Sequence, residues 1–266
     1  MAVTWSYIIS AGDPMSPLLV HVPHAATDIP YWVREDIVLS DDELADELAH
    51  MTDAHIHRIA AAAAERVPLP PWMFVNLLSR LVVDPERFPD GREQMHAVGM
   101  GAVYTRTSAG KPLRRAGPQG EAALLNQYFY PYARAFADLV DERLALVGRA
   151  IVIDVHSYPQ AALPYELHRH TKRPAVCLGV DTIHTPGALV DLATKAFAPV
   201  GDVSIDEPFA GTYVPKRHYG VDRRVESLMI EIRRDTYMTE PGGPPNRGVD
   251  LVTDSLATLL AGLPHR

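Results

Sequence analysis

The sequence predicts an α/β protein, a three-layer α/β/α sandwich with a mainly parallel or mixed central sheet. Short apolar runs of strand length alternate along the chain with longer segments of helical periodicity. The composition, 47% hydrophobic and 22% charged, is ordinary for a globular protein with a continuous core. Because no internal repeat and no linker divides the 266 residues, we expect one domain spanning 1–266.

The first predicted elements are a short strand and a long helix. Leu18–Val22 is apolar and of strand length, and it leads directly into His24. Ser40 and Glu43 have the spacing of a capping box, in which the Ser hydroxyl and the Glu carboxylate satisfy backbone amides at the start of a helix. Helical spacing of apolar residues then predicts a single helix to about Arg66.

The next stretch holds a predicted strand, a long connection and a second helix. Met73–Val83 is expected as a strand, or as a hairpin that turns at Leu78-Ser79-Arg80. The connection 90–120 is too long, at about 30 residues, for an idle loop, so we expect a lid or a segment that lines a site. Glu121–Val147 is predicted as a helix that Pro131 kinks or divides.

The segment 149–159 is predicted as a central strand. It is apolar and β-branched from Ile151 to Ile153, as in strands buried on both faces, and we expect it to end at the polar residues that follow. Asp154 and His156 would then lie at the carboxyl edge of the sheet, where open α/β sheets bind ligands.

The last third of the chain continues the alternation of strands and helices. The predicted elements are strands at 174–180, 203–205 and 227–233, helices at 186–197 and 248–260, and a polar, aromatic segment at 209–220.

The overall charge and composition exclude several classes of protein. With a net charge of -8 and no basic stripe, we expect no nucleic-acid partner. No apolar run reaches the roughly 18 residues of a membrane span, and Met1–Trp5 lacks the pattern of a signal peptide. A single cysteine, Cys177, suits a reducing cytoplasm. The sequence does not indicate an oligomeric state.

Two histidines at predicted strand ends suggest a metal site. His24 and His156 would both lie at the carboxyl edge of one sheet. A hydrolytic zinc site takes three protein ligands and leaves one position for water. A third ligand nearby would therefore complete a zinc site; without it, each histidine is better explained as a hydrogen-bonded structural residue.

The third ligand has several candidates. Asp53 and His55 lie on the first predicted helix, and Asp28 follows the first strand. Helical periodicity places His55 on the apolar stripe and Asp53 about half a turn away from it. Periodicity therefore favours His55, unless the helix breaks near Thr52.

Glu231 and a group of arginines are further candidates for chemistry. Glu231 interrupts the apolar run 228–232, so it must be paired, bound to metal or raised in pKa, unless this is an edge strand with the carboxylate facing solvent. A raised pKa suits a general base. Nucleophile elbows and phosphate loops are absent, and we expect 168–170 to be a solvated turn. Arginines that flank strand ends suggest a small anionic substrate: Arg80, Arg87, Arg217, Arg233 and Arg234.

Taken together, the sequence resembles the N-formylglutamate amidohydrolase family from about Leu18 to Met238. The resemblance is specific because its landmarks, each weak alone, occur in the right order. They are Val22-Pro23-His24-Ala25, Thr52-Asp53-Ala54-His55-Ile56, Arg80-Leu81-Val82-Val83-Asp84-Pro85-Glu86-Arg87, Asp154-Val155-His156-Ser157, Arg217-His218-Tyr219-Gly220, and Ile230-Glu231-Ile232 with Thr236-Tyr237-Met238.

The resemblance implies the fold of the zinc exopeptidases and a Zn²⁺-dependent hydrolase that removes the formyl group from N-formylglutamate, a reaction of histidine degradation. It also implies roles for particular residues. Those are His24, Asp53 and His156 as metal ligands, Glu231 as general base, His218 with an arginine at the oxyanion, Arg80, Arg87 and Arg233 at the substrate, and His55 beside the metal or substrate or as an alternative ligand.

Three positions depart from the family pattern, and all of them lie where substrate would be contacted. Ala26 replaces a Gly, Glu86 stands in an Asp-x-Asn-Arg landmark, and Thr212 replaces the second Gly of a Gly-Gly pair. The alternatives are therefore a related zinc amidohydrolase or peptidase with another small N-acyl substrate, or a catalytically silent binding protein of the same fold.

Overall fold

A mixed sheet of seven strands lies at the centre of the computed structural model, which describes residues 6–115, 117–167 and 169–263. β1 against β3 and β5 against β7 are antiparallel, and the other neighbouring pairs are parallel. In sheet order the strands are β1 (Tyr7–Ser10), β3 (Trp72–Asn76), β2 (Leu18–Val22), β4 (Ala150–Tyr158), β7 (Val225–Arg233), β5 (Val176–Gly179) and β6 (Val203–Ile205).

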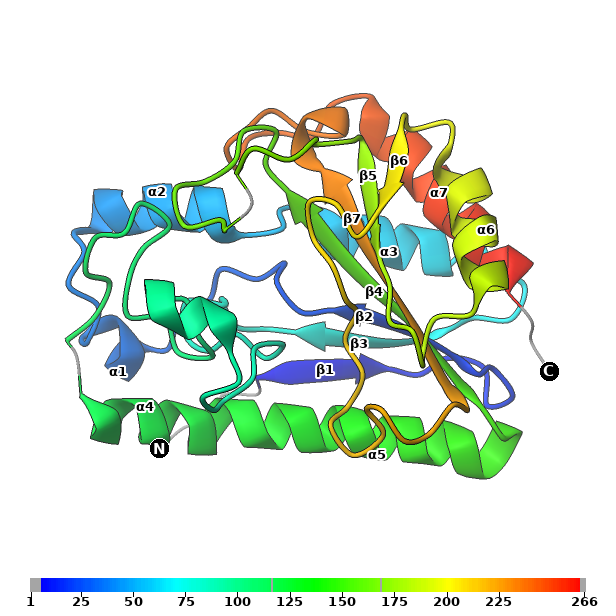
Figure 1. Cartoon of the computed structure of the whole chain (residues 1–266), viewed down its shortest axis with the longest axis horizontal. Coiled ribbons are helices and arrows are strands. Elements are labelled where there is room, and N and C mark those ends of the chain that lie inside the picture. Colours follow the sequence, from blue (N-terminus) through cyan, green and yellow to red (C-terminus); the bar gives the residue numbers. More distant parts are fainter. Residues whose placement is uncertain (1–5, 116, 168, 264–266) are drawn as a thin grey trace.

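Helices cover both faces of the sheet, which confirms the predicted three-layer α/β/α sandwich. Figure 1 shows α5 along one side of the sheet and α3, α6 and α7 on the other. The helices are α1 (Tyr31–Arg34), α2 (Asp41–Met51), α3 (Ile56–Ala64), α4 (Pro118–Leu124), α5 (Tyr130–Val147), α6 (Gly187–Phe197) and α7 (Gly248–Gly262).

Side chains that alternate along the strands pack into two separate hydrophobic cores. In β4, Ile151 and Ile153 pack into the core under α3, α6 and α7, whereas Val152 packs against α5. All nine residues of β4 are buried, as expected of a central strand covered on both faces. On the α5 face the alternation continues through Asp154 to His156, so polar groups replace apolar ones near the carboxyl end of the strand.

The prediction of one continuous helix from Ser40 to Arg66 is wrong. The capping box at Ser40 is present, but α2 ends at Met51, the backbone of Thr52 is extended, and α3 begins at Ile56. His55, just before α3, has a left-handed backbone with φ 68°. The break is stabilised from outside the helix, because the amide of Asp53 donates to the carbonyl of His24 (3.0 Å) rather than to a helical neighbour.

Other predicted elements have different bounds. The strand predicted over Met73–Val83 ends at Asn76, with no hairpin, because the Asn76 side chain accepts from the amide of Leu78 and donates to the carbonyl of Pro23. The strand at 149–159 continues to Tyr158, so His156 lies within β4 rather than after it.

The long connection, predicted as a lid or a site-lining segment, packs against α2. Its buried residues Met95, Met100 and Tyr104 pack with Leu44 and Met51 of α2. The helix predicted over 121–147 is divided as expected, by a π-helical turn at Leu125–Phe129 immediately before α5.

Two predictions concern residues outside the described part of the chain: the absence of a signal-peptide pattern at Met1–Trp5 and the turn at His168. Within the described ranges, no helix has the length and hydropathy needed to cross a membrane.

Candidate metal centre

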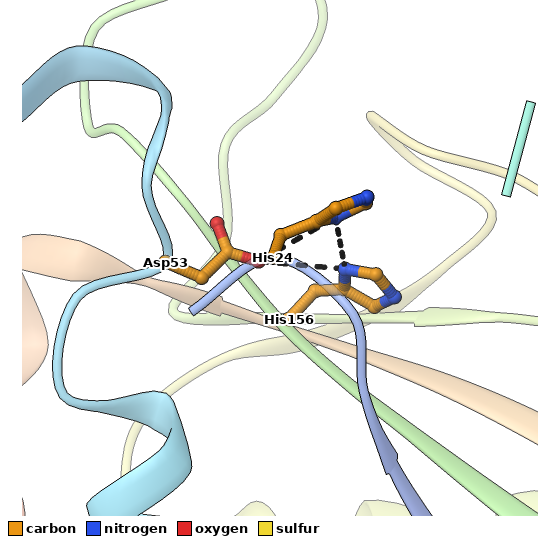
Figure 2. A group of neighbouring side chains, drawn as sticks. All are labelled: His24, Asp53 and His156. Atoms are coloured by element: carbon orange, nitrogen blue, oxygen red, sulfur yellow. Dashed lines mark hydrogen bonds and ion pairs between the residues drawn. The ribbon is translucent and has the colours of Figure 1, made fainter. Parts of the chain in front are cut away.

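Three residues from separate parts of the chain converge at the carboxyl end of the parallel strands. His24 follows β2, His156 belongs to the neighbouring β4, and Asp53 lies in the turn between α2 and α3. Figure 2 shows the two imidazole rings and the carboxylate directed at one another. Nδ1 of His24 lies 3.1 Å from Nδ1 of His156, and Oδ2 of Asp53 lies 3.4 Å from the His156 nitrogen and 3.9 Å from the His24 nitrogen.

The donor set fits a zinc ion. Ligands about 2.0–2.1 Å from a tetrahedral zinc lie roughly 3.3 Å from each other, which is close to the spacing of these three atoms. Oδ2 of Asp53 is buried and has no hydrogen-bond partner among the described residues. A buried carboxylate oxygen without a partner is costly, and a cation between it and the two nitrogens would satisfy all three.

Carboxylates lie against the outer nitrogens of both imidazoles. Nε2 of His24 is hydrogen-bonded to Oδ1 of Asp84 at 3.0 Å. Nε2 of His156 lies 3.0 Å from Oδ1 of Asp154 and 3.2 Å from Oε2 of Glu86. Such partners fix the tautomer and orientation of metal-binding histidines, leaving the opposite nitrogen free for the ion.

Arg234 holds the other oxygen of Asp53. Its Nη2 donates to Oδ1 of Asp53 at 3.0 Å, and its Nε donates to Oγ of Ser157 at 3.2 Å. Although burial alone would raise it, the pKa of Asp53 is lowered to about 2, because His156 and Arg234 both stabilise the carboxylate. Asp53 is therefore ionised, as a ligand must be, with Oδ2 directed at the histidines.

Glu231 lies beside His156 on the same face of the sheet. It is opposite His156 in the parallel register of β4 and β7 and opposite Cys177 of β5, so it is on an interior strand and not an edge strand. Its Oε2 is buried with no hydrogen-bond partner among the described residues. Burial raises the pKa of Glu231 to about 8. A carboxylate with a raised pKa binds a proton more readily than an exposed one, which is the property that a general base needs.

A small cleft leads to Glu231. It is lined by His50, Met51, Arg80, Arg87, Ser157, Tyr158, Pro159, Leu163, Tyr165, Phe209, Glu231 and Arg234. A larger concavity of about 530 Å³ lies at the other end of β4 and β7, beside Arg149 and Glu226. The clusters of metal-binding groups found among the described residues all lie away from that concavity, so we assign the chemistry to the cleft.

The arginines proposed for substrate differ in how fully they are paired. Arg80 donates to the Tyr104 hydroxyl (2.9 Å) and to Asp84 (2.7 Å). Arg87 lines the cleft, and its nearest carboxylate oxygens, on Asp84 and Glu93, are 3.7 and 3.9 Å away. Arg233 pairs with Asp235 at 2.7 Å and does not line the cleft.

Three other candidates lie away from the three-residue cluster. Nε2 of His55 is 2.9 Å from the carbonyl oxygen of Gly243, so its ring is held by another loop. Asp28 is exposed. His218 has Nε2 2.8 Å from Oδ1 of Asp141, on α5. The structure therefore does not bring His218 to the metal centre, because its ring lies against the Asp141 carboxylate on α5.

Several polar neighbours of the centre were given no role from the sequence. Asp154 was placed only at the same sheet edge as His156, although residues two apart in a strand share a face, which predicts that the two side chains lie side by side. His21 is buried in β2 and lies 2.9 Å from Asp154 through Nδ1. Its position inside an apolar strand was the available signal. Asp84 and Glu86 lie in the Arg80–Arg87 segment, but no local pattern indicates that they reach the histidines.

Comparison with known proteins identifies the family and the fold. The model of the family described as N-formylglutamate amidohydrolase matches residues 16–238. The fold is similar to the crystal structure of N-formylglutamate amidohydrolase from Ralstonia eutropha JMP134, with a TM-score of 0.81, 21% identity and 96% of each chain covered. A gene product of Agrobacterium tumefaciens is similar over 96% of this chain and 93% of its own, with a TM-score of 0.70 and 17% identity. Among proteins of curated function, none matches significantly.

Proposed function

Because this chain belongs to the N-formylglutamate amidohydrolase family, we propose that it is a cytoplasmic, zinc-dependent hydrolase that converts N-formylglutamate and water to formate and glutamate. The observation that carries the proposal is the set of three buried donor atoms on His24, Asp53 and His156, with the unpaired carboxylate of Glu231 next to them. This combination supports hydrolysis of a linear amide at a metal centre.

In this proposal the three donors hold the ion and carboxylates lie at the outer nitrogens of the histidines. A zinc ion there supplies a Lewis acid and lowers the pKa of a coordinated water to roughly 7. Asp84 is hydrogen-bonded to Nε2 of His24, and oxygens of Asp154 and Glu86 lie 3.0 and 3.2 Å from Nε2 of His156, so that the inner nitrogens face the ion.

Glu231 moves the proton. Its Oε2 accepts a proton from the attacking water, and the same group then donates that proton to the amide nitrogen as the carbon–nitrogen bond breaks. The pKa of about 8 describes the metal-free protein. A nearby dication favours the ionised carboxylate, so the loaded site would hold Glu231 ready to act as a base at neutral pH.

Arg87 is the best candidate to bind a substrate carboxylate. Arg80 and Arg87 both line the cleft, but Arg80 is hydrogen-bonded to Asp84, and Arg233 lies outside the cleft and pairs with Asp235. A guanidinium that lacks a close carboxylate partner can form a two-point interaction with a ligand at little cost. Recognition of an acidic N-acyl amino acid then rests mainly on this side chain.

A second candidate is a related amidohydrolase with another small N-acyl or peptide substrate. The observation that favours it is Glu86, an acidic side chain that lies 3.2 Å from His156, in the segment where the family pattern has an Asn. A metal-free binding protein of the same fold is the remaining alternative.

Metal analysis and a formate-release assay test the proposal. We expect one equivalent of zinc in the purified protein, loss of activity on chelation, and faster formate release from N-formylglutamate than from N-formylaspartate. N-acetylglutamate, followed by glutamate release, and short formylated peptides complete the panel. Protein without metal and without response to chelators contradicts the enzyme proposal. Activity on another substrate alone contradicts only the assignment to N-formylglutamate.

A further inference from the structure

Glu86 lies among three histidine rings. Its Oε2 is 3.2 Å from Nε2 of His156 and 3.8 Å from Nε2 of His24, and its Oε1 is 3.4 Å from Nδ1 of His21. Its side chain is 15% exposed, so it closes the polar cluster on the side nearer to solvent, whereas Asp154 is 1% exposed. Among the described residues, no Lys or Arg forms an ion pair with Glu86.

A short turn holds Glu86 in place. Its amide donates to Oδ1 of Asp84 at 3.2 Å, and the same oxygen is hydrogen-bonded to Nε2 of His24 at 3.0 Å. The two acidic residues of the Asp84-Pro85-Glu86 segment therefore reach the outer sides of the two metal-binding histidines. Because one turn positions both side chains, a change in one contact would also affect the other.

Asp154 alone is poorly placed to serve His156. Its Oδ1 is already 2.9 Å from Nδ1 of His21, and the same oxygen lies 3.0 Å from Nε2 of His156. Nε2 of His156 is buried, and neither Asp154 nor Glu86 meets it with good hydrogen-bond geometry in the metal-free protein. If this nitrogen carries the proton, Oε2 of Glu86, 3.2 Å away, is the nearby acceptor that His21 does not already share.

We propose that Glu86 is a positioning residue of the metal centre, which accepts the Nε2 proton of His156 and so directs the unprotonated Nδ1 to the ion. The inference rests on the proposed zinc function. The negative charge of Glu86 also raises the basicity of the His156 imidazole. A site with a neutral side chain at position 86 should therefore bind the metal less tightly. The Asn of the family pattern is such a neutral side chain.

Two substitutions test this role by metal affinity. Glu86→Gln keeps the shape of the side chain and removes its charge, and Glu86→Asn supplies a second, shorter variant if the first folds poorly. We expect zinc affinity, measured by competition with a chelator, to fall about 10–100-fold in both. Glu226→Gln is the matched control, because Glu226 pairs with Arg149 near the other end of β7.

A spectroscopic measurement separates positioning from a merely structural role. In the zinc-loaded wild type, the Nε2–H of His156 should give a downfield proton resonance in NMR, and Glu86→Gln should shift or remove it while circular dichroism stays unchanged. Unchanged zinc affinity in both folded variants overturns the proposal. So does binding of two metal ions with loss of one in Glu86→Gln, since Glu86 would then be a ligand. A wild type that binds no zinc contradicts the proposed function as well.

Discussion

The polar residues of this protein fall into two regions that differ in whether their donor atoms converge on one another. In the central region, Asp53 and Glu231 each keep a buried oxygen without a hydrogen bond, and the inner nitrogens of two histidines face each other. In the outlying region, a backbone carbonyl or a carboxylate lies within hydrogen-bond distance of each side chain, although Nε2 of His218 is itself buried without a hydrogen bond of good geometry. The central residues are His24, Asp53, His156 and Glu231, and the outlying residues are His55, His218 and Arg233.

The difference shows what marks a functional residue in this fold. Leaving a buried polar atom unpaired costs about 1–3 kcal/mol, so a protein tolerates several together only where something else binds them. Residue type does not separate the regions, because each contains histidine and charged side chains. Convergence does, because the donor atoms of His24, Asp53 and His156 all lie within 4.8 Å of one another, and the substitutions below test that distinction.

The largest effect should come from Asp53→Ala. Removing the third ligand leaves two histidines facing each other, so we expect zinc affinity to fall by more than about 100-fold and turnover to become undetectable. His55→Ala, two residues away, should keep the metal, because its ring is held by Gly243. Metal content after dialysis measures both variants. Loss of zinc in His55→Ala with retention in Asp53→Ala would reverse the assignment.

Glu231→Gln should keep zinc and the fold and lose turnover. Loss of a general base typically costs about 10²–10⁴-fold in rate. Glu226→Gln lies five residues earlier on the same strand and should turn over normally, since its carboxylate pairs with Arg149. Steady-state formate release with measured metal content checks both. A near-normal rate in Glu231→Gln would place the base on another residue.

Arg87→Ala should weaken substrate binding more than it slows turnover. A lost hydrogen bond to a charged group costs about 1.5–3 kcal/mol, which corresponds to a rise in KM of roughly 10–100-fold. Arg233→Ala is the outlying counterpart and should leave KM within a few-fold of wild type, because Arg233 pairs with Asp235 outside the cleft. Equal effects on KM in the two variants would remove the distinction between these arginines.

The pH dependence of stability tests the environment of Glu231 without any assay of activity. Burial raises the pKa of Glu231 to about 8 in the metal-free protein. Between pH 4.5, the ordinary pKa of a glutamate, and about pH 8, the folded state therefore binds a proton that the unfolded state has released. This contribution to stability falls as the pH rises, by up to about 1.4 kcal/mol per pH unit.

Urea unfolding of chelator-treated protein at pH 5 and pH 8 measures that dependence. The free energy of unfolding should fall more between these pH values in the wild type than in Glu231→Gln. The comparison cancels the contribution of other titrating groups, including His156, whose pKa is raised by Glu86 and Asp154 despite its burial. Parallel changes in the two proteins would mean that Glu231 is solvated and ionised throughout.

The smallest effect is expected for His218→Ala. Its ring lies against Asp141 on α5, and that carboxylate is 41% exposed, so the ion pair is worth at most about 1 kcal/mol. Turnover should stay within a few-fold of wild type. A loss of 100-fold or more would show that His218 leaves Asp141 and reaches the substrate during the reaction.

The sequence predicted the structure correctly wherever local patterns are not overridden by tertiary contacts. Apolar runs predicted β2 and β4, and the placement of His24 and His156 at one edge followed from parallel strand ends. The Asp53 turn did not follow from local rules. Periodicity favours a continuous helix, but a tertiary hydrogen bond from the Asp53 amide to His24 ends α2. Contacts such as Glu86 with His156 depend on the path of a loop, which residue patterns do not encode.

The hydrogen bond between the Asp53 amide and the His24 carbonyl also bears on how the centre is loaded. It joins the main chains of two ligand residues that are far apart in sequence, and Arg234 fixes the same carboxylate from the other side. On the proposed function, the ligands are therefore assembled before the ion arrives, and uptake carries little cost in chain ordering. Zinc should then enter a folded site, with an association rate set by access to that site rather than by refolding.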